Sequence, residues 1–400
     1  MLGLRDFGHA PVAAARGLIW DRGTVPPTRR FEWTMVVLST WLMAGGYLDA
    51  WAHRHLARLE TFFTPWHGVL YSGMFAIMIF LGSTALRNQA RGRSLAQALP
   101  AGYWLSLLGC VLFAIGGAID MFWHRAFGFE VNIAALISPP HLLLMLALGL
   151  IVTGPLRAAW RRPGSRAPYT AVLSATLLVS MLTFFDQFDQ PLVNVWAATH
   201  GSAPVSIRYV EQLGILGIMV QTALLTGIVL YLLRRFTLPF GSLTLLAGIN
   251  GAMLSSLEDN FGLIPVAIAG GLVADLVIFR LHPGPRRVRA LRAASFLAPA
   301  AVCALYLLVL AVTRGITWPV HLWLGSIFIA GAIGWLLSYL SVPPPMPVPG
   351  DPLEPVVKGP EASGRPAPLV PQRPRLSAAA EAPLPDPDVG PGITYAIGHS

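Results

Sequence analysis

Long apolar runs recur along most of the chain, and short polar segments separate them. Ten such runs occupy residues 32–53, 63–86, 102–123, 135–156, 169–187, 211–233, 240–257, 262–281, 293–313 and 319–340. A helix of about 20 apolar residues crosses the roughly 30 Å hydrocarbon core of a bilayer. The pattern therefore predicts an all-α fold, a polytopic transmembrane helix bundle of about 10 spans over residues 32–340.

Composition agrees with a membrane protein. Hydrophobic residues make up 54% of the chain and charged residues 12%, and the mean hydropathy is +0.61. The formal net charge of +9 comes largely from arginines in the short loops between apolar runs, so it indicates topology and no nucleic-acid partner. Cys110 and Cys303 lie far apart inside apolar runs, which indicates neither a disulfide framework nor a thiolate metal motif.

The arginines predict which side of the membrane each loop faces. They cluster after the second, fourth, sixth and eighth runs, at 87–93, 157–166, 234–235 and 280–292. Cytoplasmic loops carry an excess of basic residues, so we expect a multi-pass protein of the bacterial inner (plasma) membrane with both termini cytoplasmic. Residues 1–31 have no sustained apolar core, which predicts a cytoplasmic segment without a cleavable signal.

The last part of the chain changes composition abruptly. Residues 341–400 contain 16 prolines and little apolar periodicity. Such a segment cannot bury enough apolar surface to fold by itself. We expect a disordered Pro-rich cytoplasmic tail and assign it no function.

Carboxylates and imidazoles concentrate at two places, each between two apolar runs. The first place holds Asp49, His53, Glu60 and His67, and the second repeats the same order with Asp120, His124, Glu130 and His141. Ionisable groups near a membrane interior are costly and are usually paired or functional. A lone aspartate–histidine pair is more often a helix cap or an intramembrane hydrogen bond. Direct hairpin repeats of the whole order favour a metal site on the outer face.

The spacing within each repeat suits metal binding. Asp49 and His53 are four residues apart, which places them on one face of a helix, and His67 follows Pro65, a residue tolerated at a helix start. Nitrogen and oxygen donors without thiolates favour copper, zinc, iron or manganese. His55 has no counterpart in the second repeat, where Ala126 stands, so we place it outside the ligand set.

Two other polar positions lie outside this repeat. Asp275 falls well inside the eighth run, where it needs a partner, and Asn250 and Gln221 are candidates that would together suggest a proton path. His321 belongs to a third Pro-x-His sequence without the preceding aspartate and histidine. It adds a ligand from across the bundle or ends a helix, and the second interpretation is slightly favoured.

Three functions fit these patterns. The first is an integral membrane metalloprotein with an outward-facing Asp/His/Glu site, either a metal-dependent oxidoreductase or a hydrolase, in which Glu60 or Glu130 acts as ligand or proton acceptor. The alternative is a metal-ion or proton-coupled transporter, and the third is a structural membrane subunit. Because the repeats are direct, we expect the two sites to share one composite pocket.

The sequences GGYLDAWAH, ETFFTPWH and ISPPH, within residues 32–340, resemble a family of uncharacterised bacterial polytopic integral membrane proteins. The Asp49-x3-His53-x13-His67 pattern is also similar to the Asp-x3-His-x12-His metal-binding pattern in the C subunit of particulate methane and ammonia monooxygenases. That likeness implies that Asp49, His53 and His67 are copper ligands of an oxygen-activating membrane enzyme. This chain departs from the pattern by one residue in the first repeat and has x16 in the second.

Overall fold

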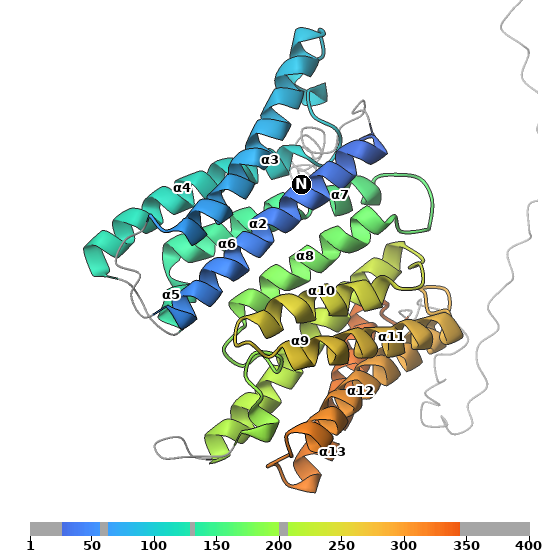
Figure 1. Cartoon of the computed structure of the whole chain (residues 1–400). Coiled ribbons are helices and arrows are strands. Elements are labelled where there is room, and N and C mark those ends of the chain that lie inside the picture. Colours follow the sequence, from blue (N-terminus) through green and yellow to red (C-terminus); the bar gives the residue numbers. More distant parts are fainter. Residues whose placement is uncertain (1–25, 57–62, 129–132, 200–206, 345–400) are drawn as a thin grey trace, which may run out of the picture. The chain divides into compact units, whose positions relative to one another are not determined.

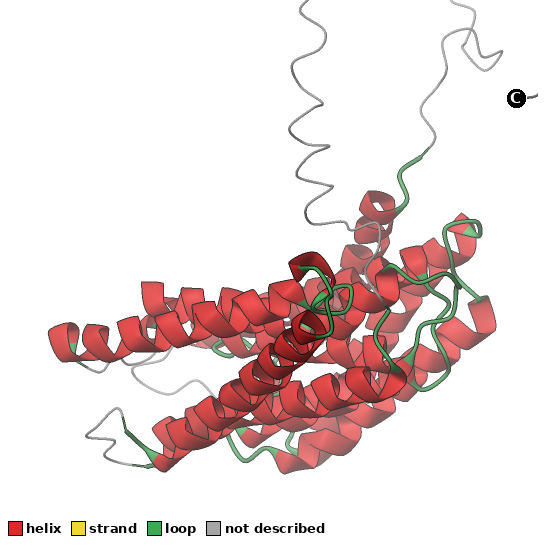
Figure 2. Cartoon of the chain, turned by 90° about the horizontal axis from the view of Figure 1, so that it is seen from above, coloured by secondary structure: helices red, strands yellow, loops and turns green. Residues whose placement is uncertain are grey.

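The computed structural model describes residues 26–56, 63–128, 133–199 and 207–344, and these residues form helices joined by loops, without a β-strand (Figures 1 and 2). The α-helices are α2 (Arg29–His55), α3 (Pro65–Ala90), α4 (Trp104–Phe127), α5 (Ala134–Ile137), α6 (Pro139–Val152), α7 (Gly154–Trp160), α8 (Tyr169–Phe185), α9 (Ile207–Arg235), α10 (Ser242–Ser256), α11 (Ile264–Leu281), α12 (Val288–Thr313) and α13 (Val320–Ser341). Short 3-10 helices occupy Leu95–Gln97, Trp196–Ala198 and Phe261–Leu263. The all-α prediction is confirmed for this part of the chain.

Six helices in the described residues are long and apolar enough to cross a membrane, which indicates a multi-pass membrane protein. They are α3, α4, α9, α11, α12 and α13, the α11 span being counted from Phe261. The pair α6 and α7 would make a seventh span with a bend of 46°. Each of the ten apolar runs contains a helix, but α8 has only 17 residues and α10 only 15, and α2, with 27 residues, is not among the helices apolar enough to cross. The expected count of about ten is therefore not confirmed.

The first half of the described chain forms a ring of four helices. α2 packs on α3, α3 on α4, α4 on α6, and α6 again on α2. Buried apolar side chains, including Met35, Leu42, Met74, Ile77 and Phe113, fill the space between these helices. The two hairpins predicted from the repeat are thus neighbours in the structure.

Small residues let the two helices of the first hairpin approach closely. A Cβ atom on Gly45 would lie 2.7 Å from the Leu70 Cα, and one on Gly73 would lie 2.9 Å from the Leu42 Cα. These contacts between backbones leave no room for a side chain. Close approach through small residues is the usual way for membrane helices to pack.

The second hairpin repeats this packing. A Cβ atom on Gly116 would lie 3.0 Å from the Leu144 Cδ2. Leu144 follows His141 by three residues, just as Leu70 follows His67. A glycine four residues before each aspartate therefore faces a leucine three residues after each histidine. The hairpin repeat extends beyond the polar residues to the contacts that hold its helices together.

Helix α8 connects this ring to the second half, because it packs on α2 and α6 as well as on α10. From α10 the packing continues through α11, α12 and α13 to α9. Pro299 lies inside α12. Because proline has no backbone N–H, the Ser295 carbonyl oxygen has no hydrogen-bond donor four residues later in the helix. A Cβ atom on Gly334 of α13 would lie 3.0 Å from the Pro299 Cγ and would clash with this carbonyl oxygen. The close α12–α13 packing thus occurs at the irregular turn.

Asp275 caps a neighbouring helix. Its carboxylate accepts hydrogen bonds from the Leu243 backbone N–H at 3.1 Å and from the Thr244 backbone N–H and hydroxyl at 2.8 Å and 2.7 Å. These donors belong to the first turn of α10, where backbone N–H groups have no partner within the helix and favour a negative charge.

The prediction that Asn250 or Gln221 pairs with Asp275 is therefore wrong. The Asn250 Oδ1 accepts a hydrogen bond from Thr183 at 2.8 Å, and the Gln221 Oε1 accepts one from Gln190 at 2.6 Å. The unpaired N–H groups of α10 are better donors for a carboxylate than these amides. The proton path suggested by the three residues has no support in this arrangement.

Candidate metal centre

The first hairpin brings two imidazoles to one carboxylate. Asp49 and His53 lie on consecutive turns of α2, and His67 lies in the first turn of α3. The Asp49 Oδ2 is 3.7 Å from the His53 Nε2 and 3.3 Å from the His67 Nε2. These three residues, the first triad, each offer a ligand atom, and the three atoms lie within 4.8 Å of one another.

The start of α3 determines where His67 lies. Thr64 is the N-cap residue, and its Oγ1 accepts a hydrogen bond from the His67 backbone N–H at 3.1 Å. Pro65 is the first residue of the helix. The prediction that this proline opens the helix is confirmed. The Thr64 cap and Pro65 together start α3 two residues before His67.

The second hairpin builds the same arrangement. Asp120 and His124 come from the last two turns of α4, and His141 comes from the first turn of α6, which Pro139 opens. The Asp120 Oδ1 is 3.4 Å from the His124 Nε2 and 3.6 Å from the His141 Nε2. This second triad is more enclosed, since the Asp120 side chain is only 4% exposed whereas that of Asp49 is 15% exposed.

In the second triad both imidazoles are held through their other nitrogen. The His124 Nδ1 lies 3.3 Å from the Gly128 carbonyl oxygen, and the His141 Nδ1 lies 2.7 Å from the Ser138 Oγ. In the tautomer with the proton on Nδ1, each imidazole donates this hydrogen bond, and its Nε2 lone pair faces Asp120. Metal-binding histidines are commonly oriented in this way by partners that do not bind the metal themselves.

Ser138 contacts a candidate ligand, His141, and the sequence interpretation did not identify it. It stands directly before Pro139, and Thr64 stands directly before Pro65. A hydroxyl residue before Pro-x-His therefore occurs in both repeats, and this shared feature is the signal that could have found it. The two hydroxyls differ in use, because Thr64 caps the helix backbone whereas Ser138 holds the imidazole.

The Asp49 Oδ1, which is not the oxygen that faces the imidazoles, is buried and makes no hydrogen bond within the described part of the chain. The Asp120 Oδ1 is also buried without a hydrogen bond, and it is the atom that faces both imidazoles of the second triad. Buried polar atoms are normally hydrogen-bonded. Ligands at about 2.1 Å from a tetrahedral metal ion lie about 3.4 Å apart, which matches the observed aspartate–histidine distances of 3.3–3.7 Å. The donor set and its spacing fit a transition metal ion with one coordination position left open.

Six of the eight predicted ligands thus come together as two groups of three. The other two, Glu60 and Glu130, lie outside the described residues, so their part in the site stays a prediction. The aspartate–histidine distances of each triad are 3.3–3.7 Å, and all three ligand atoms of each triad lie within 4.8 Å of one another. His321 differs from these residues, because its side chain is exposed at the start of α13 and belongs to neither group.

Tyr71 lies between the two triads. It lies one helical turn after His67, and the ring centroids of the two residues are 6.2 Å apart. The Tyr71 hydroxyl packs directly against Gly117 of α4. Gly117 precedes Asp120 by three residues. Both Asp49 and Asp120 act electrostatically on this hydroxyl. Asp49 also interacts electrostatically with Asp120 and His141. The triads are therefore close enough for a charge bound at one to influence the other.

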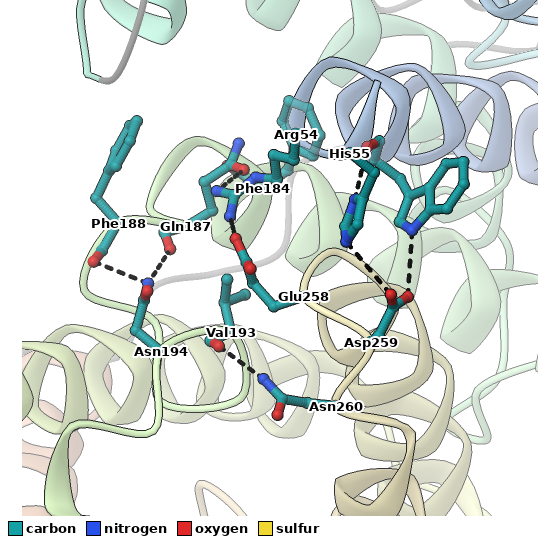
Figure 3. Close-up of polar contacts among 11 residues, drawn as sticks. Arg54, His55, Phe184, Gln187, Phe188, Val193, Asn194, Glu258, Asp259 and Asn260 are labelled. Atoms are coloured by element: carbon teal, nitrogen blue, oxygen red, sulfur yellow. Dashed lines mark hydrogen bonds and ion pairs between the residues drawn. The ribbon is translucent and has the colours of Figure 1, made fainter. Parts of the chain in front are cut away.

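The end of α2 is anchored by a separate set of contacts (Figure 3). The Arg54 guanidinium pairs with Glu258 and donates to the Gln187 side chain at 2.6 Å. The His55 Nε2 lies 3.3 Å from the Asp259 carboxylate, and its Nδ1 lies 2.9 Å from the Trp51 carbonyl oxygen. His55 therefore points away from the first triad, in agreement with its lack of a counterpart in the second repeat.

No protein-family model, curated protein or solved structure matches this chain. The resemblances noted from the sequence motifs remain predictions, and the interpretation of the site depends on its own geometry.

Proposed function

We propose that this chain is an integral membrane metalloprotein that binds one transition metal ion at each Asp–His–His triad. The observation that carries the proposal is the convergence of two Nε2 atoms on one carboxylate, repeated in two hairpins, with Asp120 buried and Asp49 half-buried. A helix cap or a single hydrogen bond requires one imidazole at most. Two imidazoles at each carboxylate, the unpartnered Asp49 Oδ1 of the first triad and the Nδ1 partners of the second triad together fit a metal ion better.

The donor set narrows the choice of metal. Carboxylate and imidazole ligands without thiolate suit copper(II), zinc or iron, and manganese to a lesser extent. Three protein ligands leave the fourth coordination position of a tetrahedral ion open, as in catalytic zinc sites. In this proposal water or oxygen would bind at that open position and be activated by the ion, and the protein would act as a membrane oxidoreductase or hydrolase. The arginine distribution supports a site on the outer face of the inner membrane.

Transport is the less favoured alternative. It would require polar groups that continue the path from the triads through the membrane. Asp275, the residue proposed for that step, is occupied by the N-terminus of α10. A purely structural role stays as the alternative that the metal measurement tests.

The test is elemental analysis of the purified protein after reconstitution with zinc, iron, manganese and copper in turn. We expect two ions per chain in the parent, one in each of the His53→Ala and His124→Ala variants, and none in the double variant. His55→Ala is the matched control, because His55 lies two residues from His53 on the same helix but pairs with Asp259. It should retain two ions. Absence of stoichiometric metal in the parent would refute the proposal and leave the structural role.

A further inference from the structure

A cavity lies in the second half of the chain, on different helices from the two triads. Its volume is about 180 Å³, and its walls come from α9, α10, α11 and α12 together with residues 190–192. Most of the lining is aliphatic, for example Leu225, Val229, Leu246 and Val302. An engineered apolar cavity of about 150 Å³ admits benzene. This cavity is therefore large enough for one ring-sized apolar molecule.

Some side-chain oxygen atoms in this apolar wall make no hydrogen bond. Gln190 is fully buried, and although its Nε2 donates to Gln221 at 2.6 Å, its Oε1 is buried without a hydrogen bond in the described part of the chain. Thr222 and Thr226 are each 8% exposed and line the cavity from consecutive turns of α9. Within the described residues neither hydroxyl makes a hydrogen bond. This differs from Thr176 and Thr183, whose hydroxyls bond to the backbone four residues earlier.

Unused hydrogen-bonding groups in an apolar cavity indicate the chemistry of an occupant. The Gln190 Oε1 accepts a hydrogen bond, and the two threonine hydroxyls can donate or accept. A single hydroxyl on an otherwise apolar ring can donate to the first group and accept from the second. A water molecule would satisfy these groups but would leave the aliphatic remainder of the cavity without contacts.

We propose that this cavity is a binding site for a ring-sized, membrane-soluble molecule that carries a hydroxyl group, of the phenol or quinol class. Its ring lies among the aliphatic side chains of α9, α10, α11 and α12. Its hydroxyl lies at the wall formed by Gln190, Thr222 and Thr226. This site is independent of the metal triads, so each proposal can fail without the other.

Cys303 provides a direct measurement, because it lines the cavity and is 7% exposed. The chain has two cysteines, and Cys110→Ser leaves Cys303 as the only thiol. The assay is the rate at which N-ethylmaleimide modifies Cys303 in the full-length protein, with increasing 4-butylphenol or butylbenzene, each corrected for its partition into the detergent micelle. We expect both compounds to slow labelling, with 4-butylphenol effective at a concentration roughly two- to tenfold lower, as one hydrogen bond provides.

Two variants in the same background test the assignment of groups. Thr222→Val with Thr226→Val keeps the side-chain shape, so it should preserve protection by butylbenzene and reduce the advantage of the phenol, which keeps its hydrogen bond to the Gln190 Oε1. Ala298→Phe fills the cavity and should abolish protection by both compounds. Thermal unfolding of each variant confirms that it is folded. Equal protection by both compounds in the parent would show a lipid-filled cavity without polar recognition, and no protection would show that there is no site; either result would overturn the proposal.

Discussion

Ser138 gives the sharpest test of the second triad. Its Oγ is 2.7 Å from the His141 Nδ1, and the residue is 4% exposed, so water does not readily replace the hydroxyl in Ser138→Ala. Loss of a hydrogen bond that orients a metal-binding histidine typically costs 10–100-fold in metal affinity. That corresponds to about 1.4–2.7 kcal/mol. Ser138 makes no side-chain cap bond to α6, so the effect is expected on metal binding and not on the helix.

The measurement is a zinc titration against a chromophoric chelator in the His53→Ala background, where only the second triad binds. Ser138→Thr keeps the hydroxyl and should restore most of the affinity. The matched control is Thr64→Ala in the same background, which removes the cap of α3 at a cost of about 1 kcal/mol in stability but leaves the second triad intact. A zinc affinity of Ser138→Ala within about twofold of the background, or an equal loss in Thr64→Ala, would refute this reasoning.

Three further predictions follow from the packing and the ligand types. Gly45→Ala should cost about 1–3 kcal/mol in unfolding free energy and lower the metal content of the first triad, because its Cβ would lie 2.7 Å from the Leu70 Cα. Gly46→Ala should keep the stability and the metal content of the parent, because its Cβ would have its nearest contact at 3.8 Å. Elemental analysis with SDS-induced unfolding distinguishes them, and equal behaviour of the two variants would contradict the packing argument. Asp275→Ala should reduce the unfolding free energy by about 1.5–3 kcal/mol, because the charged hydrogen bonds to α10 are lost. Its metal content should stay at the parent value, and a loss of metal would instead place Asp275 on a path to the triads. Bound zinc should be released as the pH falls, because protonated imidazoles do not bind metal, and dialysis at a series of pH values measures it; metal retention that does not depend on pH would exclude histidine ligands.

The hydrophobic pattern alone predicted much of the architecture. Each apolar run contains a helix, and α3 and α6 begin at the prolines that precede His67 and His141. This success has a local cause, since helix formation depends on residues within one or two turns. The same local spacing placed each aspartate and its first histidine on one face of a helix. The ability to cross a membrane is less local. The shortness of α8 and α10, and the absence of α2 from the helices apolar enough to cross, leave the number of spans at six or seven.

The sequence by itself determined the all-helical class and which aspartates and histidines are candidate ligands, because composition, periodicity and the repeated order are properties of the chain alone. Only the tertiary structure decided what those residues contact. Asp275 accepts hydrogen bonds from the N-terminus of α10, His55 pairs with Asp259, and Tyr71 contacts the second hairpin. Each of these outcomes depends on how closely helices distant in sequence approach. That approach is set by small residues such as Gly45 and Gly117, whose partners become known only when the helices are packed.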